Sequence, residues 1–220
     1  MFIVLHTEIV DLPVGFTADS LLDVLPDALR KSIKHYKNEH DRLVRVAGKL
    51  LLLEAHGAIG YGKELILSDL CYSSENKPFI PGGLHFSIAH AFPCVVCVLS
   101  KSASVGIDVE VPTLLDVEAF AADYLTEREV CALNESPNLT ECFLRFWVRK
   151  EAVLKCAGTA LGHDMPDVLE CPTTFMGQQF FFKDFLFASN AFCSIASSEP
   201  LKNMSVKSVD FTDMIKRHLV

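Results

Sequence analysis

Two segments with helical periodicity, each accompanied by short strand-like segments, constrain the fold of this 220-residue chain more than any other feature. Apolar residues recur at helical spacing over residues 21–53 and over residues 140–157. The second segment is followed by Gly158, which suits the left-handed position after a helix. Because each half of the chain combines one long helix with several strands, we expect an α+β fold with two lobes of similar build.

The two lobes are expected to meet near residues 100–104, which divides the chain into residues 1–101 and residues 102–220. Shorter helices are expected over residues 117–124 and from residue 126 onward. Strands are expected over residues 2–10, 65–67, 84–88, 94–99, 105–109, 179–187, 192–196 and 206–211.

Composition and charge exclude several classes of protein. Half of the residues are hydrophobic and 16 are Phe, which is enough for a sizeable core. The net charge of −8 argues against a general binder of nucleic acid or anionic membranes, since both need a basic face. Residues 1–5 lack the basic start of a targeting signal, and no apolar run approaches the roughly 20 residues that span a bilayer. We therefore expect a cytoplasmic protein that binds neither nucleic acid nor membrane.

The distribution of the eight cysteines is also typical of a cytoplasmic protein. Most of them lie in apolar runs, as reduced and buried thiols of a cytosolic protein do. Only Cys94 and Cys97 have the spacing of a metal or redox pair, but no second pair follows, and a zinc site needs about four ligands. Their strand-like apolar context favours a core strand over metal or redox chemistry.

The segment Val105-Gly-Ile-Asp-Val-Glu110 places two carboxylates on one face of a strand. Alternate side chains of a strand share a face, so Asp108 and Glu110 point one way while Ile107 and Val109 point into the core. Two residues advance about 6.6 Å along a strand, which lets both carboxylates reach one hard cation such as Mg²⁺. The alternative is a strand whose solvated face simply ends in acidic residues.

The helix that begins near residue 140 carries a second polar stripe. Trp147, Glu151, Lys155 and Gly158 follow one another at spacings of three or four, so they line one side of the helix. A carboxylate, an ammonium and the only tryptophan on one stripe are unusual for a purely structural helix. The alternative is a favourable Glu-to-Lys pair, worth roughly 0.2–0.5 kcal/mol, beside a core tryptophan.

A third segment offers basic groups. Lys77 and Pro78 place an ammonium beside a rigid backbone, and His90 ends a strand-like run where it can donate to a phosphate oxygen. An isolated histidine is more often an ordinary loop residue, so this segment gains meaning only together with the other two.

The order of these segments resembles the 4′-phosphopantetheinyl transferase superfamily, in particular its surfactin-synthetase-activating branch. The shared pattern is Lys-Pro, then Phe-x-Ile-x-His, then Gly-Ile-Asp-Val-Glu, then Trp-x-x-Lys-Glu-Ala-x-x-Lys-x-x-Gly. The two acidic motifs together are the specific signature, and the resemblance is strong over residues 75–162 and weak elsewhere. It implies two lobes related by a pseudo-twofold axis, each a small, mostly antiparallel sheet packed with a long helix, in a monomer.

The resemblance also implies roles for individual residues. Asp108, Glu110 and Glu151 match the carboxylates that hold Mg²⁺, with Mn²⁺ as an alternative. Lys155 and His90 match groups beside the phosphates of coenzyme A. Lys77 and Pro78 match the segment that borders the adenine.

Several positions stay open or depart from the family pattern. Glu129 either orients or deprotonates the attacking hydroxyl, or only completes a capping box with Thr126. Ala89 replaces a frequent serine that bonds the 3′-phosphate, and Asn76 replaces a glycine in a turn that Asn can also form. Candidates for the basic residues that bind phosphate in the first lobe are Lys31, Lys34, Arg42 and Arg45.

The implied activity is transfer of 4′-phosphopantetheine from coenzyme A to a serine of an apo acyl or peptidyl carrier protein. Adenosine 3′,5′-bisphosphate leaves, and the base is Glu151, Glu129 or a metal-bound hydroxide. The resemblance places carrier docking around residues 113–130. A magnesium-dependent phosphohydrolase and a coenzyme A-binding relative without turnover are the alternatives.

Overall fold

The computed structural model describes residues 1–62, 64–113, 116–162, 165–187 and 190–219. The helices are α1 (Ala18–Leu22), α2 (Asp27–Lys34), α3 (Glu39–Ile59), the 3₁₀ turn η1 (Leu67–Asp69), α4 (Val117–Tyr124), α5 (Glu127–Asn134), α6 (Leu139–Ala157) and α7 (Phe211–Leu219). The strands are β1 (Phe2–Glu8), β2 (Cys71–Tyr72), β3 (Pro78–Phe79), β4 (His85–Ala91), β5 (Cys94–Ser100), β6 (Val105–Glu110), β7 (Thr173–Phe175), β8 (Gln178–Leu186), β9 (Phe192–Ser197) and β10 (Met204–Ser208).

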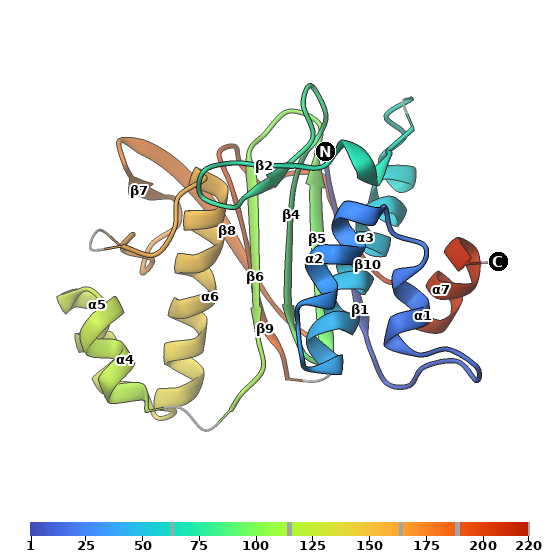
Figure 1. Ribbon diagram of the computed structural model, residues 1–220. Helices are drawn as coiled ribbons and strands as arrows, with labels where there is room; N and C mark the ends of the chain where they lie inside the picture. The colour runs from blue at the N-terminus through green and yellow to red at the C-terminus, as the bar shows by residue number, and fades with distance from the viewer. Residues whose placement is uncertain (63, 114–115, 163–164, 188–189, 220) are drawn as a thin grey trace.

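Two four-stranded sheets form the centre of the molecule, and each packs against one long helix (Figure 1). The first has the order β10-β1-β5-β4 and packs against α3; the second has the order β6-β9-β8-β7 and packs against α6. All pairings are antiparallel except that of β1 with β10. This arrangement confirms the expected α+β fold of two sheets, each with a long helix.

Alternation along the strands sorts their side chains into three apolar clusters. In β1, Ile3 and Leu5 face α3, whereas Phe2 and Val4 face a cluster between the two sheets. That middle cluster also contains Ile107 and the other core-facing residues of β6. The two lobes therefore share a continuous apolar interior, which holds them in a fixed relation.

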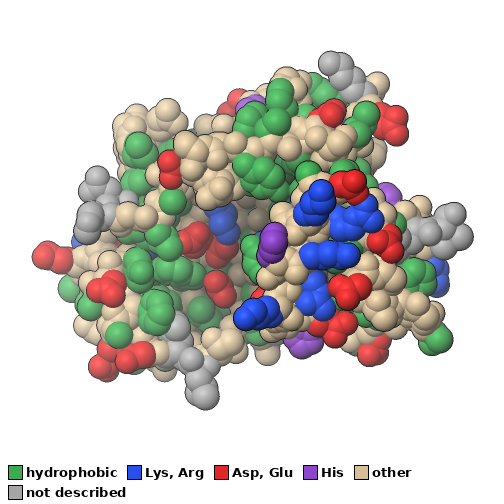
Figure 2. All heavy atoms as spheres, viewed as in Figure 1, with side chains coloured by type: hydrophobic (Ala, Val, Ile, Leu, Met, Phe, Trp, Pro, Cys, Tyr) green, Lys and Arg blue, Asp and Glu red, His purple; other side chains and the backbone are tan. Residues whose placement is uncertain are grey.

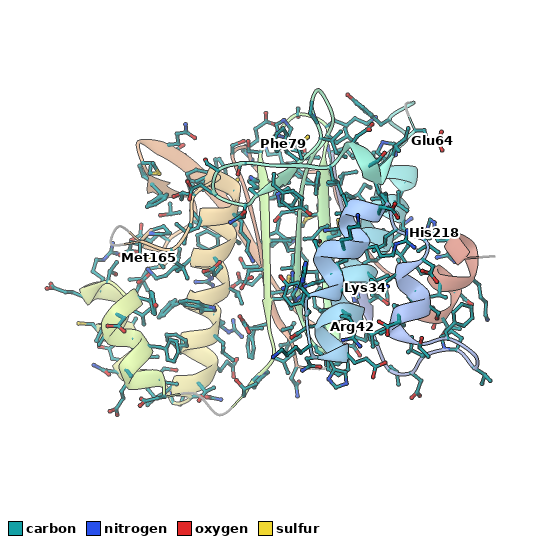
Figure 3. All side chains as sticks on the ribbon, in the orientation of Figure 1. Lys34, Arg42, Glu64, Phe79, Met165 and His218 are labelled. Carbon is teal, nitrogen blue, oxygen red and sulfur yellow. The ribbon has the colours of Figure 1, made fainter. Side chains whose placement is uncertain are left out.

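The end of the chain returns to the first lobe. Strand β10 pairs with β1, and α7 packs against α3, where Glu54 bonds Arg217 at 2.8 Å and His218 at 3.0 Å. Figure 3 shows His218 on this side of the molecule. The last part of the chain therefore packs on the lobe that contains β1 and α3, and the pairing of β10 with β1 is a long-range contact with no local signal in the sequence.

Three local predictions were wrong. The expected helix over residues 21–53 is divided into α1, α2 and α3, because Pro26 precedes a new helix and Asn38 caps another with its side chain. The strand expected over residues 65–67 is absent, because residues 65 and 66 have no regular secondary structure and Leu67 begins a 3₁₀ turn. The helix α7 was not predicted, although Phe211, Met214 and Ile215 have helical spacing.

Other local predictions were confirmed. Helix α6 ends where expected, with Gly158 in the left-handed conformation at φ +78°. Asn76 adopts φ +58°, as the turn requires. Cys94 and Cys97 lie buried within β5, as a core strand implies. No helix in the described part of the chain has the length and apolarity to cross a membrane.

Gly106 allows the closest approach between α6 and β6. A Cβ atom at this position would lie 2.1 Å from the carbonyl oxygen of Ala152 and 2.4 Å from the backbone nitrogen of Cys156. Both atoms belong to the backbone of α6, so no side-chain rotation can relieve the clash. Any side chain at this position would push α6 away from the strand that carries Asp108.

We expect Gly106→Ala to destabilise the protein by about 2 kcal/mol or more and to lower Tm by roughly 4–8 °C in thermal unfolding. Gly57→Ala is the matched control, because Gly57 lies in α3 and an added Cβ atom there would meet nothing within 4 Å. Without a clash, alanine should stabilise the helix by about 0.5–1 kcal/mol. Equal Tm values for wild type and Gly106→Ala would contradict the close approach.

Candidate active site

The pair of Asp108 and Lys155 joins β6 to α6. The Lys155 ammonium donates to Oδ1 of Asp108 at 2.5 Å, and Asp108 is only 5% exposed. Its other oxygen, Oδ2, is buried and has no hydrogen-bond partner. Burial raises the pKa of Asp108 despite the nearby ammonium. The result is a buried carboxylate with one acceptor oxygen to spare.

Two more carboxylates share this environment. Burial, followed by repulsion from Asp108, raises the pKa of Glu110 to about 7, although the Trp147 side chain donates a hydrogen bond to it. Burial also raises the pKa of Glu151, with Asp108 adding to the effect. Lys155 experiences the reverse: burial alone would lower its pKa, but the surrounding carboxylates raise it. Three acidic groups thus act on one ammonium.

The carboxylates of Asp108, Glu110 and Glu151 have the chemistry that a divalent cation requires. Within the described ranges, no group of three His, Cys, Asp or Glu side chains converges as a finished metal site. However, the acidic groups offer hard oxygen ligands of the kind that Mg²⁺ prefers, and Oδ2 of Asp108 is an unpartnered acceptor among them. A bound cation would also relieve the repulsion that raises the pKa values of Glu110 and Glu151. The residues therefore suit the group, with small side-chain movements still required.

A cavity of about 440 Å³ lies between the two lobes beside these groups. Glu151 and Lys155 line it from α6, and Lys77 and Pro78 line it from the first lobe. The Lys77 ammonium donates to the backbone oxygen of Lys155 at 2.5 Å and to that of Cys156 at 3.4 Å. Lys77 thus caps the carboxyl end of α6 from the opposite lobe.

A second cavity of about 580 Å³ is basic. Arg45 and Lys49, one turn apart on α3, line it together with Tyr36 and Tyr72. Nε of Arg45 is buried without a hydrogen-bond partner, and the guanidinium lies 3.7 Å from the centre of the Tyr36 ring. Burial and then the charge of Arg45 lower the pKa of His90 to about 4, with smaller effects of Lys155 and Lys49. These cations form a cluster that suits an anion.

The other basic candidates lie elsewhere on the first lobe. Lys31 and Lys34 are exposed on α2 and do not line the basic cavity. Arg42 donates to the backbone oxygens of Tyr36 and Lys37 and lies 3.4 Å from Asp19. Lys34 and Arg42 are labelled in Figure 3 on this lobe. Of the four candidates, the structure brings only Arg45 to the cavity wall.

Figure 2 shows how these groups are distributed around a hollow between the lobes. Acidic side chains and Lys or Arg atoms are visible inside it, hydrophobic side chains gather to its left, and Lys and Arg side chains gather on the surface of the lobe to its right. Acidic side chains are thus accessible from solvent within this hollow.

Comparisons with known proteins agree with this geometry. A family model described as the 4′-phosphopantetheinyl transferase superfamily matches residues 104–203. The 4′-phosphopantetheinyl transferase HetI of Nostoc sp. is 28% identical over 160 residues, which are 69% of this chain and 66% of HetI. The 4′-phosphopantetheinyl transferase gsp of Aneurinibacillus migulanus is 31% identical over 87 residues, which are 39% of this chain and 36% of gsp. AcpT of Salmonella typhimurium, also named a 4′-phosphopantetheinyl transferase, is 26% identical over 72% of this chain and 75% of its own length.

Over residues 104–203, just under half of its length, the chain is thus similar to the 4′-phosphopantetheinyl transferase superfamily. The matches span just under two thirds of HetI and about a third of gsp. The matched residues 104–203 include the acidic cluster of Asp108, Glu110 and Glu151, but not the basic cavity of the first lobe.

Glu129 does not line the cavity beside the acidic cluster. It is fully buried, and its side chain accepts hydrogen bonds from the backbone N–H groups of Thr126 and Val168, both at 2.8 Å. Thr126 completes the capping box by accepting from the Glu129 N–H at 3.3 Å. The geometry corresponds to the capping-box alternative.

Sequence analysis missed two groups at the site. Lys49 could have been found, because it follows Arg45 by four residues and shares its side of α3. Ser87 carried no signal: it is buried in β4 and its hydroxyl accepts from the Ile107 N–H at 3.2 Å, which joins β4 to β6. Ala89 is buried in the core between the sheets, so it faces away from the basic cavity. The expected docking segment, residues 113–130, includes residues 114–115, which lie outside the described residues.

The pKa of Glu110 predicts a pH-dependent stability in the metal-free protein. Its folded-state pKa of about 7 exceeds the usual 4.5, so its contribution to folding is complete below pH 4.5 and is lost as the pH rises through 7. We expect Glu110→Gln to become more stable than wild type by roughly 1–2 kcal/mol at about pH 8, with chelator present.

Thermal unfolding at several pH values measures this difference. Glu118→Gln changes an exposed glutamate of α4 and serves as the control. A Tm difference between Glu110→Gln and wild type that stays constant from acid to alkaline pH would show that the folded protein does not raise the pKa of Glu110.

Proposed function

We propose that this chain transfers the 4′-phosphopantetheine of coenzyme A to a serine of an apo carrier protein and releases adenosine 3′,5′-bisphosphate. The observation that carries the proposal is that Glu151 and Lys155 line a cavity between the lobes, that Arg45 and Lys49 line a second cavity, and that Asn76 lines both. Two neighbouring cavities of this kind can bind a doubly phosphorylated nucleotide at the basic groups and a cation at the acidic groups. The similarity to the 4′-phosphopantetheinyl transferase superfamily and to HetI supports the same reaction.

Asp108, Glu110 and Glu151 would hold Mg²⁺, with Mn²⁺ as the alternative. The cation would neutralise charge that develops on the pyrophosphate during transfer. Lys155, already held at Asp108, is placed to face the same phosphate oxygens. Lys77 and Pro78 line the cavity at the position proposed for the adenine, while the ammonium of Lys77 also holds the end of α6.

Glu151 is the group best placed to accept the serine proton. It lines the cavity, and burial raises its pKa, which makes its carboxylate a stronger base than an exposed glutamate. Glu129 has no access to the cavity, because it is fully buried and its oxygens already accept three bonds. His90 and Arg45 would bind the 3′-phosphate together with Lys49.

The protein substrate is an acyl or peptidyl carrier, and we expect the enzyme to act as a monomer in the cytoplasm. Around the acidic cluster, Tyr124 packs edge-on against Trp147 at 5.1 Å between ring centres. Phe120, also on α4, is 39% exposed. These aromatic groups offer an apolar surface to the carrier next to the acidic cluster.

The reaction is tested by the intact mass of an apo acyl carrier protein and an apo peptidyl carrier after incubation with this chain, coenzyme A and Mg²⁺. We expect a gain of one phosphopantetheine that a chelator prevents. Phosphate release without a carrier would indicate a phosphohydrolase. No gain with either carrier, combined with coenzyme A binding in calorimetry, would indicate a protein that binds without transfer.

Asp108→Ala should abolish transfer in that assay while leaving the fold nearly intact, because Lys155 keeps the neighbouring carboxylates as partners. The expected loss is at least about 100-fold in kcat/KM. Asp11→Ala, at an exposed position, is the control. Near wild-type turnover of Asp108→Ala with Mg²⁺ would refute the assignment of the metal ligands.

The basic cavity predicts how the enzyme recognises the 3′-phosphate. Arg45→Met combined with Lys49→Met should raise KM for coenzyme A roughly tenfold, but should hardly change KM for 3′-dephospho-coenzyme A. The reason is that these two cations would face only the missing phosphate. A larger effect from Lys31→Met combined with Lys34→Met would instead place the 3′-phosphate at the exposed face of α2.

A further inference from the structure

A buried ion pair involves a residue of α6 that points to a different side of the helix from Glu151 and Lys155. The Lys150 ammonium is 2.7 Å from Oε2 of Glu129, and both side chains are 0% exposed. Lys150 directly precedes Glu151 in the helix. Neither Glu129 nor Lys150 lines the two cavities of the active site. The pair is thus a costly buried feature that the proposed mechanism leaves unused.

Every strong acceptor of this pair is engaged. Oε1 of Glu129 accepts from the Val168 N–H at 2.8 Å, and Oε2 accepts from the Thr126 N–H at 2.8 Å as well as from Lys150. Lys150 also donates to the backbone oxygen of Pro166 at 2.6 Å. Because these bonds reach the start of α5 and residues 166–168, the pair joins three separate segments in one network.

The network is placed to set the orientation of α6. On one side of the helix, Gly106 lets the backbone touch β6, and Lys155 bonds Asp108. On another side, Lys150 holds α5 and the segment that begins with Met165, which lies across α6 from β6 in Figure 3. Rotation of α6 about its axis would break one set of contacts or the other.

We propose that Glu129 and Lys150 are positioning residues, which fix the rotation of α6 so that Glu151 and Lys155 face Asp108. The inference rests on the proposed transferase function, because its readout is turnover. It assigns Glu129 no proton transfer. The orientation of α6 requires only that neither charge is buried without its partner. Replacing both charged side chains by uncharged ones should therefore preserve that orientation.

Breaking a buried pair leaves one charge without its partner, whereas removing both charges together is often tolerated. In Lys150→Met, the Glu129 carboxylate stays buried and faces only the two backbone N–H groups. In Glu129→Gln, the Lys150 ammonium keeps only the Pro166 oxygen and an amide oxygen as acceptors. Either single change should shift α6, whereas the double variant leaves no buried charge at this place.

The test compares Lys150→Met, Glu129→Gln and the double variant with wild type, each assayed well below its own Tm so that all are folded. We expect kcat to fall roughly tenfold or more in each single variant, since small displacements of catalytic groups are costly, with KM for coenzyme A less affected. In the double variant, kcat should return to within about threefold of wild type. The pH dependence of kcat should keep its acid limb in all of them.

Arg145→Met is the matched control, because Arg145 pairs with Glu141 on the same helix but at an exposed position, 48% and 41% exposed respectively. It should leave kcat unchanged. A double variant as inactive as Glu129→Gln, with a displaced acid limb, would overturn the inference and make Glu129 the base. Normal kcat in the folded single variants would also overturn it, because the pair would then only stabilise the fold. If the wild-type protein itself does not transfer phosphopantetheine, the result refutes the proposed function.

Discussion

The contact between β6 and α6 at Gly106 is the constraint on which the site depends. Glycine at this position lets the helix backbone lie against the strand, closer than any side chain would permit. Because Asp108 follows two residues later on the strand and Lys155 lies on the last turn of the helix, the same approach brings them within 2.5 Å. Packing and chemistry are thus set by one contact: the distance between two backbones decides whether an ammonium and three carboxylates can share one space.

That shared space is electrostatically unfavourable without a ligand. Burial and mutual repulsion raise the pKa values of Glu110 and Glu151, and the single ammonium of Lys155 offsets only part of the negative charge. At the basic cavity the charge imbalance has the opposite sign: burial lowers the pKa of His90, and the positive charges of Arg45, Lys155 and Lys49 lower it further. A metal cation at one side and an anionic phosphate at the other would relieve both. Such strain in the free protein is typical of sites shaped for charged ligands.

Much of the site could be predicted because its signals are local. Alternation in β6 placed Asp108 and Glu110 on one face, and spacing in α6 placed Glu151 and Lys155 on one stripe. Glu129 shows the limit of such reasoning: its capping box was visible in the sequence, but its partner Lys150 lies 21 residues on and gave no signal of pairing. Lys77 shows it too, because its bond to the end of α6 crosses between lobes.

By itself the sequence determined which elements could form and which chemistry they could carry, since periodicity, caps and motif spacing act over a few residues. It determined the α+β class, the end of α6 at Gly158 and the acidic cluster. The tertiary structure alone decided the return of β10 and α7 to the first lobe, the choice of Arg45 and Lys49 for the basic cavity, and the burial of Glu129. The physical reason is that these outcomes depend on contacts between residues far apart in the chain, whose energies exist only once the core has formed.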